Sequence, residues 1–367
     1  MNEASAIASN KVGTDTVRST AGGGKPTNAR LLKALRLERA DTTPVWFMRQ
    51  AGRSLPEYRA IKEKYTLLEI CRRPELCAEV TLQPVRSLGV DGAVLYADIM
   101  HPLIGIGIDL EIVENVGPVV AHPIRDAAGI RRLRPLEPDD VAFVRDGIRC
   151  TLSALAAQVP LIGFAGAPFT LASYLVEGRP SRDFLETKRL MYRDPELWHD
   201  LMSRLAGIVT AYARMQAQAG VHAIQIFDSW VGALSVDDYR RYVLPYSLSI
   251  FRNLEVTGLP LIHFGAGASS LLEVMREAGG STLGLDWRIP IDSAWNRIGY
   301  DRGIQGNLDP LVLLGPWDVV RRETLSILDR AAGRPGHIFN TGHGIHPQTS
   351  PDMLRRVVAL VHEHGST

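Results

Sequence analysis

The strongest constraint on the fold is a repeated pattern in which short apolar or β-branched runs alternate with stretches of helical spacing. This alternation is typical of parallel α/β proteins, because parallel strands need a long crossover between them. Eight such units over about 340 residues predict an α/β fold of the (β/α)8 TIM-barrel type, distorted by insertions. The predicted strands are Pro44–Met48, Ala93–Tyr96, Leu161–Ala165, Ala223–Phe227, Leu261–Phe264, Thr282–Leu285, Gly303–Gly306 and His337–Asn340.

Helical spacing is clearest in two of the connecting stretches. Apolar residues recur at every third or fourth position in Pro195–Ala219 and in Pro351–His362, which predicts two amphipathic helices. The longest insertion follows the second predicted strand, where Gly105–Val120 alternates apolar residues around two glycines. This insertion is expected to form an added hairpin that can serve as one wall of a cleft.

The first 28 residues differ from the rest of the chain. They are rich in Ser, Thr, Asn and Gly, and they lack the apolar core of a signal peptide. Gly24-Lys25 is followed by Pro26 and preceded by no strand, so it does not match a phosphate-binding loop. Residues 1–28 are therefore expected to be a disordered extension, and 29–367 a single catalytic barrel domain.

Composition narrows the class of partner. The chain has 41 basic and 40 acidic residues and a net charge of +1, so it lacks the global field of a nucleic-acid or membrane-surface binder. No segment reaches the roughly 18 apolar residues of a membrane span. The three cysteines, Cys71, Cys77 and Cys150, lack the C-x-x-C spacing of zinc or redox sites and are expected to be reduced packing residues. We expect a cytoplasmic protein with no bound metal.

Polar residues follow the predicted strands at the end where barrel enzymes carry their sites. Two arginines, a carboxylate, hydroxyls and a histidine suggest a site for a polyanion around a central acidic group. No G-x-S-x-G elbow is present, so nucleophilic hydrolysis is not indicated. The residues at the predicted strand ends are Arg49, Gln50, Arg53, Asp98, Tyr174, Asp228, Ser229, His263, Asp286, Asn307 and His343.

Several of these residues have simpler interpretations. The arginines can bridge to surface acids, and Asp98 can be a helix N-cap or an ion-pair partner. The pair His343 and His346 suggests a metal, but too few ligands accompany it; flanking glycines favour a hydrogen bond from His343 to a substrate carboxylate. The Gly265–Gly267 turn, with Ser270 and Glu273, can hold a phosphate, although a capping box is the favoured interpretation.

Two long segments resemble the signatures of the uroporphyrinogen decarboxylase family. Residues 44–53, PVWFMRQAGR, are similar to the family pattern P-x-W-x-M-R-Q-A-G-R, and residues 163–178 resemble its second signature. The resemblance extends over residues 30 to 365 through shorter matches at residues 96–99, 227–229, 285–287, 305–310 and 340–344.

The resemblance implies a distorted (β/α)8 barrel, a homodimer, no cofactor, and conversion of uroporphyrinogen III to coproporphyrinogen III by decarboxylation of four acetate side chains. The catalytic residues would be Asp98, Arg49 and Arg53. Three departures from the family pattern affect local pocket shape: Tyr96-Ala97 before the aspartate, Arg179, and Trp230. The implied substrate-binding residues are Arg49, Gln50, Ala51, Gly52, Arg53, Asp98, Tyr174, Ser229 and His343.

Two other functions are compatible with the same barrel. One is a corrinoid-linked, zinc-dependent methyltransferase, which needs thiolate ligands; none of the three cysteines is predicted to lie in the barrel mouth. The other is a tetrapyrrole-binding protein without catalysis. Metal analysis tests the first alternative and a turnover assay tests the second.

Overall fold

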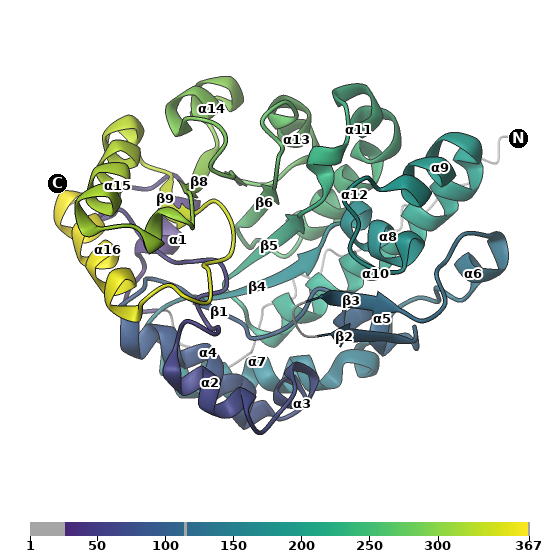
Figure 1. Cartoon of the computed structure of the whole chain (residues 1–367), viewed down its shortest axis with the longest axis horizontal. Coiled ribbons are helices and arrows are strands. Elements are labelled where there is room, and N and C mark those ends of the chain that lie inside the picture. Colours follow the sequence, from purple (N-terminus) through teal and green to yellow (C-terminus); the bar gives the residue numbers. More distant parts are fainter. Residues whose placement is uncertain (1–25, 114–115, 366–367) are drawn as a thin grey trace, which may run out of the picture.

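The computed structural model describes residues 26–113 and 116–365. Within them, seven parallel strands form a curled sheet in the order β1-β4-β5-β6-β7-β8-β9, surrounded by helices (Figure 1). Each strand coincides with a predicted run, which confirms the TIM-type α/β fold, although β1 pairs over two residues only. The strands are β1 (Ala93–Val94), β4 (Leu161–Gly166), β5 (Ala223–Asp228), β6 (Leu261–Gly265), β7 (Thr282–Gly284), β8 (Gly303–Leu308) and β9 (His337–Thr341).

The first predicted strand, Pro44–Met48, is wrong as a strand: it makes one isolated bridge to β9, at Val45. Two backbone N–H groups that would bond to a neighbouring strand in a sheet instead donate to side chains. The N–H of Val45 donates to Asp91 at 2.8 Å and that of Met48 donates to Asn340 at 3.0 Å. The N–H of Asp91 in turn donates to the carbonyl of Val45 at 2.8 Å. The segment thus joins β9 to the chain entering β1 and closes the barrel through both backbone and side-chain hydrogen bonds.

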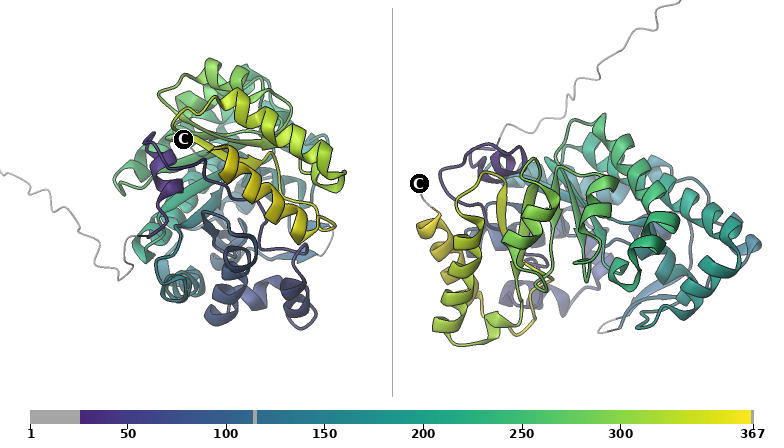
Figure 2. Two further views of the ribbon diagram at one scale, coloured as in Figure 1. Left: turned by 90° about the vertical axis from the view of Figure 1, so that its left-hand side faces the viewer. Right: turned by 90° about the horizontal axis from the view of Figure 1, so that it is seen from above.

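Helices form the outer layer of the barrel, and α15 and α16 lie side by side along one edge (Figure 2). Among the described residues the α-helices are α1 (Arg30–Leu35), α2 (Pro56–Lys62), α3 (Leu67–Cys71), α4 (Pro74–Leu88), α5 (His101–Gly105), α6 (Ala127–Arg131), α7 (Ala142–Leu155), α8 (Pro168–Glu177), α9 (Leu185–Arg193), α10 (Pro195–Ala219), α11 (Val236–Tyr242), α12 (Leu244–Glu255), α13 (Leu272–Ala278), α14 (Ile291–Ile298), α15 (Trp317–Ala331) and α16 (Pro351–His364). Three short 3-10 helices are η1 (Pro138–Val141), η2 (Val231–Ala233) and η3 (Val312–Leu314).

The two helices predicted from periodicity are confirmed. α10 has the predicted bounds because its ends carry clear signals: the Asp194 side chain accepts from the N–H of Leu197 at 3.0 Å, and Gly220 ends the helix with a φ of 109°. α16 begins at the predicted residue, after the cap Ser350, and runs two residues further, to His364.

The predicted hairpin is confirmed with a later start. β2 (Leu110–Val113) pairs antiparallel with β3 (Gly117–Val120), and Leu110 lies opposite Val120. The first residue of the predicted hairpin, Gly105, instead ends α5. The hairpin lies on the front face of the barrel in Figure 1, beside α5.

The barrel interior is closed at one end by α1. Leu31 and Leu35 of this helix join an inner apolar cluster with Trp46, Ile162 and Phe264, which come from the barrel wall. Residues just before the strands, 91–92 and 157–158, contact the chain leading into α1. Because α1 covers the amino ends of the strands, the carboxyl ends form the open mouth.

The described part of the N-terminal tail is short. Thr27 and Asn28 donate backbone hydrogen bonds to the carbonyls of Ala157 and Gln158, at 2.7 and 3.0 Å. The remainder of the predicted extension, up to residue 25, lies outside the described residues.

Candidate active site

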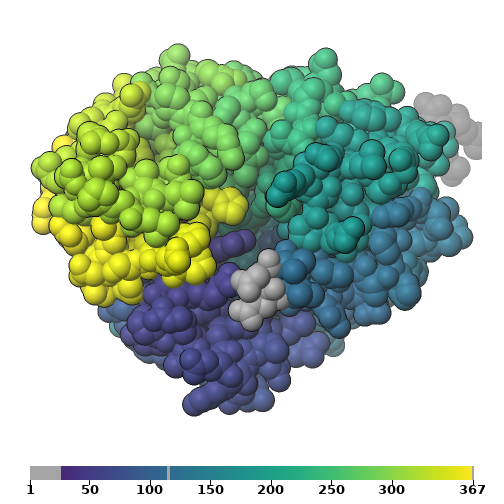
Figure 3. Space-filling view, viewed as in Figure 1, coloured from purple at the N-terminus to yellow at the C-terminus, as the bar shows by residue number. Residues whose placement is uncertain are grey.

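The face opposite α1 is hollowed at its centre (Figure 3). Segments from both ends of the chain, purple and yellow in Figure 3, border the hollow together with central segments in teal and green. This is the arrangement expected of a barrel mouth, where loops after several strands meet.

Arg49 lies at this mouth and has an unusual backbone conformation. Its φ is 62°, a left-handed value that is uncommon for a residue with a Cβ. Two glycines make room for it: a Cβ at Gly52 would lie 2.7 Å from the Arg49 carbonyl oxygen, and a Cβ at Gly344 would collide with the Arg49 side chain. The N–H of Ile345 also donates to the carbonyl of Met48 at 2.9 Å. The loop after β9 therefore packs directly against the arginine, and strained backbone of this kind is frequent at functional sites.

Asp98 lies half-buried between β1 and α5. Its Oδ1 accepts a hydrogen bond from the N–H of Met100 at 2.9 Å, and its own N–H donates to Nδ1 of His101 at 3.3 Å. Burial raises the pKa of Asp98, while the Met100 amide and the charge of Arg49 act in the opposite direction. Arg49 therefore lies close enough to Asp98 to act on its charge, so these two predicted residues belong to one group.

Tyr174 joins the group from α8. Its ring meets that of Trp230 nearly edge-on, with centroids 5.8 Å apart. Burial raises the pKa of Tyr174 to about 12; the charge of Asp98 adds to this shift and that of Arg49 opposes it. The phenol is therefore neutral and can donate a hydrogen bond. Ser229, half-buried, directly precedes Trp230.

His343 is the fourth member of the group. Burial lowers its pKa to about 4, and the charges of Arg49 and Arg288 lower it further, against a smaller effect of Asp286. The imidazole is therefore neutral near pH 7 in the free protein. In this state it can donate or accept a hydrogen bond but carries no charge of its own.

The other residues of the family segment have mixed positions. Gln50 is buried; its side chain accepts from the N–H of Phe47 at 3.1 Å and donates to the carbonyl of Gly92 at 2.8 Å, so it fixes the backbone on both sides of the barrel closure. Ala51 is half-buried and Arg53 is exposed, in the loop that leads to α2. A contact of these three residues with substrate stays a prediction.

Three further strand-end residues have other roles. His263 was expected at the mouth, but it is fully buried and its ring lies 4.8 Å from that of Phe251 in α12, on the outer side of the sheet. Asn307 donates to the carbonyls of Asp286 and Ile289 and holds the loop after β7. Asp286 accepts from the N–H of Gly267 and from Arg288.

The predicted capping box after β6 is wrong. Helix α13 begins at Leu272 with no side-chain cap. Glu273 pairs with Arg297 at 2.7 Å, and the N–H of Gly267 is taken by Asp286. The turn is thus held by a carboxylate from the neighbouring strand end, a partner that the local sequence does not show.

The cysteines and the histidine pair bear on metal binding. Cys71 and Cys77 are buried, and both thiols lie within 3.5 Å of the Tyr96 carbonyl. Burial raises the pKa of Cys77 to about 12, so its thiol is a poor ligand and nucleophile. His346 accepts from the N–H of Gln348. Across residues 26–113 and 116–365, no three His, Cys, Asp or Glu side chains are grouped so that they could hold a metal ion.

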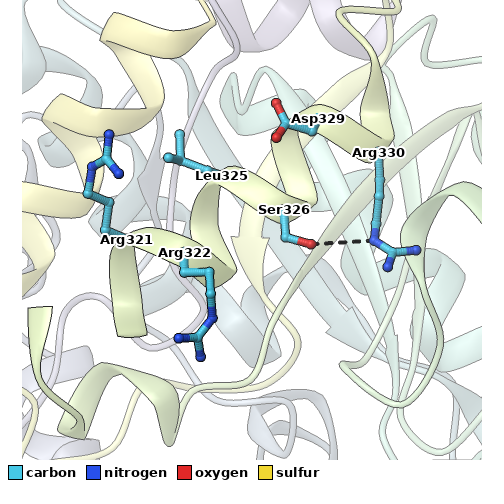
Figure 4. A pocket seen from close by; sticks show the side chains of 6 residues that line it. All are labelled: Arg321, Arg322, Leu325, Ser326, Asp329 and Arg330. Carbon is cyan, nitrogen blue, oxygen red and sulfur yellow. Dashed lines mark hydrogen bonds between the residues drawn. The ribbon is translucent and has the colours of Figure 1, made fainter. Parts of the chain in front are cut away.

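A separate depression lies on the outer helix layer, along α15 (Figure 4). It is shallow, and two of its three arginines already have acidic partners: Arg330 donates to Asp292 at 3.1 Å and Arg322 to Glu323 at 3.0 Å. The hollow at the mouth, with its grouped polar residues, is therefore the better candidate site.

Asp228, at the end of β5, shows how the site is built on buried polar groups. It is fully buried, accepts a hydrogen bond from Thr170 at 3.1 Å, and burial raises its pKa to about 7.

The raised pKa makes stability depend on pH. Between about pH 4 and 7 the Asp228 carboxyl keeps its proton in the folded protein but has lost it in the unfolded chain, so its contribution to stability falls as pH rises through this range. The Asp228→Asn variant should be more stable than wild type at pH 8 by roughly 2 kcal/mol, with a smaller difference at pH 5.

Urea unfolding at the two pH values measures this effect. Asp237→Asn, at an exposed position of α11, is the control and should follow wild type at both pH values. Equal stability of Asp228→Asn and wild type at pH 8 would contradict the raised pKa of Asp228.

A TIM-type barrel with a cation, a carboxylate, a phenol and an imidazole grouped at its mouth defines a barrel enzyme for an acidic substrate. Residues 26–364 match the model of the family described as Uroporphyrinogen decarboxylase (URO-D). The chain belongs to the uroporphyrinogen decarboxylase family.

Relatives agree with this assignment over nearly the whole chain. A uroporphyrinogen decarboxylase of Sorangium cellulosum is 54% identical over 334 residues, covering 91% of this chain and 95% of the relative. One of Streptomyces coelicolor is 55% identical over 335 residues, covering 91% and 94%. A solved structure, a methyltransferase from Methanosarcina mazei, covers 93% of this chain and 99% of that one with a TM-score of 0.73 at 20% identity, which shows a shared fold.

Sequence reasoning missed Arg288, the second cation beside His343. Its position in the sequence could have identified it, because Arg288 follows Asp286 by two residues, just after a predicted strand.

No described helix is both long and apolar enough to cross a bilayer.

Proposed function

We propose that the protein removes the carboxyl groups from the four acetate side chains of uroporphyrinogen III and yields coproporphyrinogen III. The observation that carries this proposal is the grouping of Arg49, Asp98, Tyr174 and His343 at the mouth of a chain that belongs to this family. A tetrapyrrole with carboxylates at its edge and N–H groups at its centre is complementary to such a site. Arginines bind the edge, and the carboxylate binds the centre.

The chemistry requires an electron sink. Breaking the bond between the acetate methylene and its carboxylate releases carbon dioxide and leaves an electron pair on the methylene carbon. A pyrrole protonated at its ring α-carbon is cationic and accepts that pair. Protonation of the methylene carbon and loss of the α-proton then give a methyl group, so each decarboxylation consumes one proton in total.

Asp98 is the residue that stabilises this cation in our proposal. Its carboxylate accepts hydrogen bonds from the pyrrole N–H groups, and its position is fixed before substrate binds by the Met100 amide. Burial raises its pKa, which makes the carboxylate a stronger hydrogen-bond acceptor. Arg49 and Arg53 bind substrate carboxylates, while Tyr174, Ser229 and neutral His343 orient the macrocycle. Gln50, Ala51 and Gly52 shape the loop that presents the two arginines.

An anaerobic turnover assay tests the function directly. Supplied with uroporphyrinogen III, the protein should release carbon dioxide and produce the hepta-, hexa- and pentacarboxylic intermediates before coproporphyrinogen III. Chromatography of the oxidised products measures each step. Binding without carbon dioxide release would instead identify a tetrapyrrole-binding protein.

Metal analysis of the same preparation separates the methyltransferase. Full activity after chelation is expected for the decarboxylase. Stoichiometric zinc that is required for activity would contradict it. The methyltransferase structure shares 20% identity and shows only a common fold. The proposal also includes a homodimer, as the family resemblance implies, and a cytoplasmic location, as the sequence leads us to expect. Sedimentation of the full chain tests the dimer.

A further inference from the structure

Arg288 is held in a defined position beside the mouth. It lies in the loop after β7, where its Nη1 donates to Oδ2 of Asp286 at 2.5 Å and its backbone N–H donates to Oδ1 at 3.0 Å. Its guanidinium lies over the ring of Trp287, 4.2 Å from the centroid. Asp286 is buried and also accepts from the N–H of Gly267. The arginine is thus oriented by an ion pair and by stacking before any ligand binds.

The loop of Arg288 is in direct contact with the loop of His343. A Cβ added at Gly342 would lie 2.5 Å from the backbone nitrogen of Trp287, so the two loops pack backbone against backbone. Arg288 and Arg49 both act electrostatically on His343. The side chain of Arg288 is 52% exposed. The mouth therefore carries a second oriented cation, in the loop that follows β7.

The guanidinium retains hydrogen-bonding capacity. Arginine has five N–H donors, and within residues 26–113 and 116–365 the acceptor of the Arg288 side chain is Asp286, through one nitrogen. The remaining edge can bind a carboxylate in the two-point geometry that arginine favours.

We propose that Arg288 is a specificity-determining residue that binds one carboxylate of the tetrapyrrole substrate. This inference rests on the proposed function, which supplies a substrate with eight carboxylates. Arg49 and Arg53 both come from the loop after Met48, whereas a cation from the loop after β7 adds a separate point of attachment. Because the contact is the same before and during the reaction, it affects substrate binding more than the chemical step.

The Arg288→Gln variant tests the proposal. We expect KM for uroporphyrinogen III to rise at least about tenfold, with kcat within about twofold of wild type, since a charge-assisted bond to carboxylate is lost. Arg276→Gln is the matched control, because Arg276 is an arginine paired with Asp301 on the outer helix layer, with a side chain that is 39% exposed. Its KM should equal that of wild type. An unchanged KM for Arg288→Gln would overturn the proposal.

A second variant separates binding from support of Asp286. Arg288→Lys keeps a cation beside Asp286 but lacks the planar fork, so it should unfold at the wild-type urea concentration and still show a raised KM. If both variants lose stability and kcat while KM stays constant, the role of Arg288 is structural.

The bound carboxylate can be a propionate or an acetate, and the pentacarboxylic intermediate distinguishes them. An equal rise in KM for the octacarboxylic and pentacarboxylic substrates identifies a propionate, which persists throughout. A rise for the octacarboxylic substrate alone identifies an acetate. Wild-type protein that fails to decarboxylate either substrate would contradict the proposed function itself, a result distinct from active wild type with an unaffected Arg288→Gln.

Discussion

Replacement of Asp98 by asparagine is expected to lower kcat/KM about a thousandfold while the fold is retained. A charge pair separated by about 4 Å in an effective dielectric near 20 is worth on the order of 4 kcal/mol, which corresponds to roughly three orders of magnitude in rate. Asparagine keeps the size of the side chain and an oxygen that can accept from the Met100 amide, but it cannot stabilise a cation by charge. Steady-state kinetics under anaerobic conditions measure the change.

The control for this variant is Asp109→Asn, at an exposed position just before β2. It changes the net charge equally and should leave kcat/KM unaffected. A folded Asp98→Asn protein with near wild-type kcat/KM would remove Asp98 from the mechanism.

Replacement of Asp91 by asparagine is expected to lower the free energy of unfolding by about 3 kcal/mol, the largest stability change among the substitutions described. This buried carboxylate accepts from Asn28, Arg30, the N–H of Val45 and His362, and so ties the N-terminal segment and α16 to the barrel closure. Burial alone would raise the pKa of Asp91, but the hydrogen bonds, foremost that of His362, hold it below its usual value. An amide would place N–H donors against N–H donors.

Urea unfolding near pH 7 measures this loss. The lowered pKa of Asp91 means that its contribution is present above the unfolded-state pKa, near 4, and is lost as pH falls through the folded-state value. The two proteins should therefore differ less at low pH. Asp41→Asn is the matched control: Asp41 is the exposed partner of the same arginine, Arg30, and should contribute less than about 1 kcal/mol. Equal stability of Asp91→Asn and wild type would contradict this account of barrel closure.

The order of strands and helices could be predicted because each depends on local periodicity. Pro44–Met48 could not be assigned correctly, since two of its N–H groups bond to the side chains of Asp91 and Asn340, which lie 46 and 292 residues away. The apolar pattern of the segment is the same whether the partner is a strand or a side chain.

The orientation of His263 is established by the structure. Side chains alternate along a strand, and its neighbours Ile262 and Phe264 belong to the inner cluster, so His263 must point outward. Arg49 and Asp98 were predicted because residues after parallel strands converge on one face, and the role of Asp98 was favoured only by the family resemblance. Gln50 follows the same rule, yet its side chain bonds to the backbone, a choice that depends on atoms far apart in the sequence.

The central claim is that Asp98 lies beneath the centre of a bound macrocycle. Crystals grown anaerobically with coproporphyrinogen III test it most directly. We predict that an Asp98 oxygen lies within about 3 Å of pyrrole nitrogens, with Arg49 at a propionate. A macrocycle bound in the same hollow with its nitrogens turned away from Asp98, or one bound outside the hollow, would contradict the account.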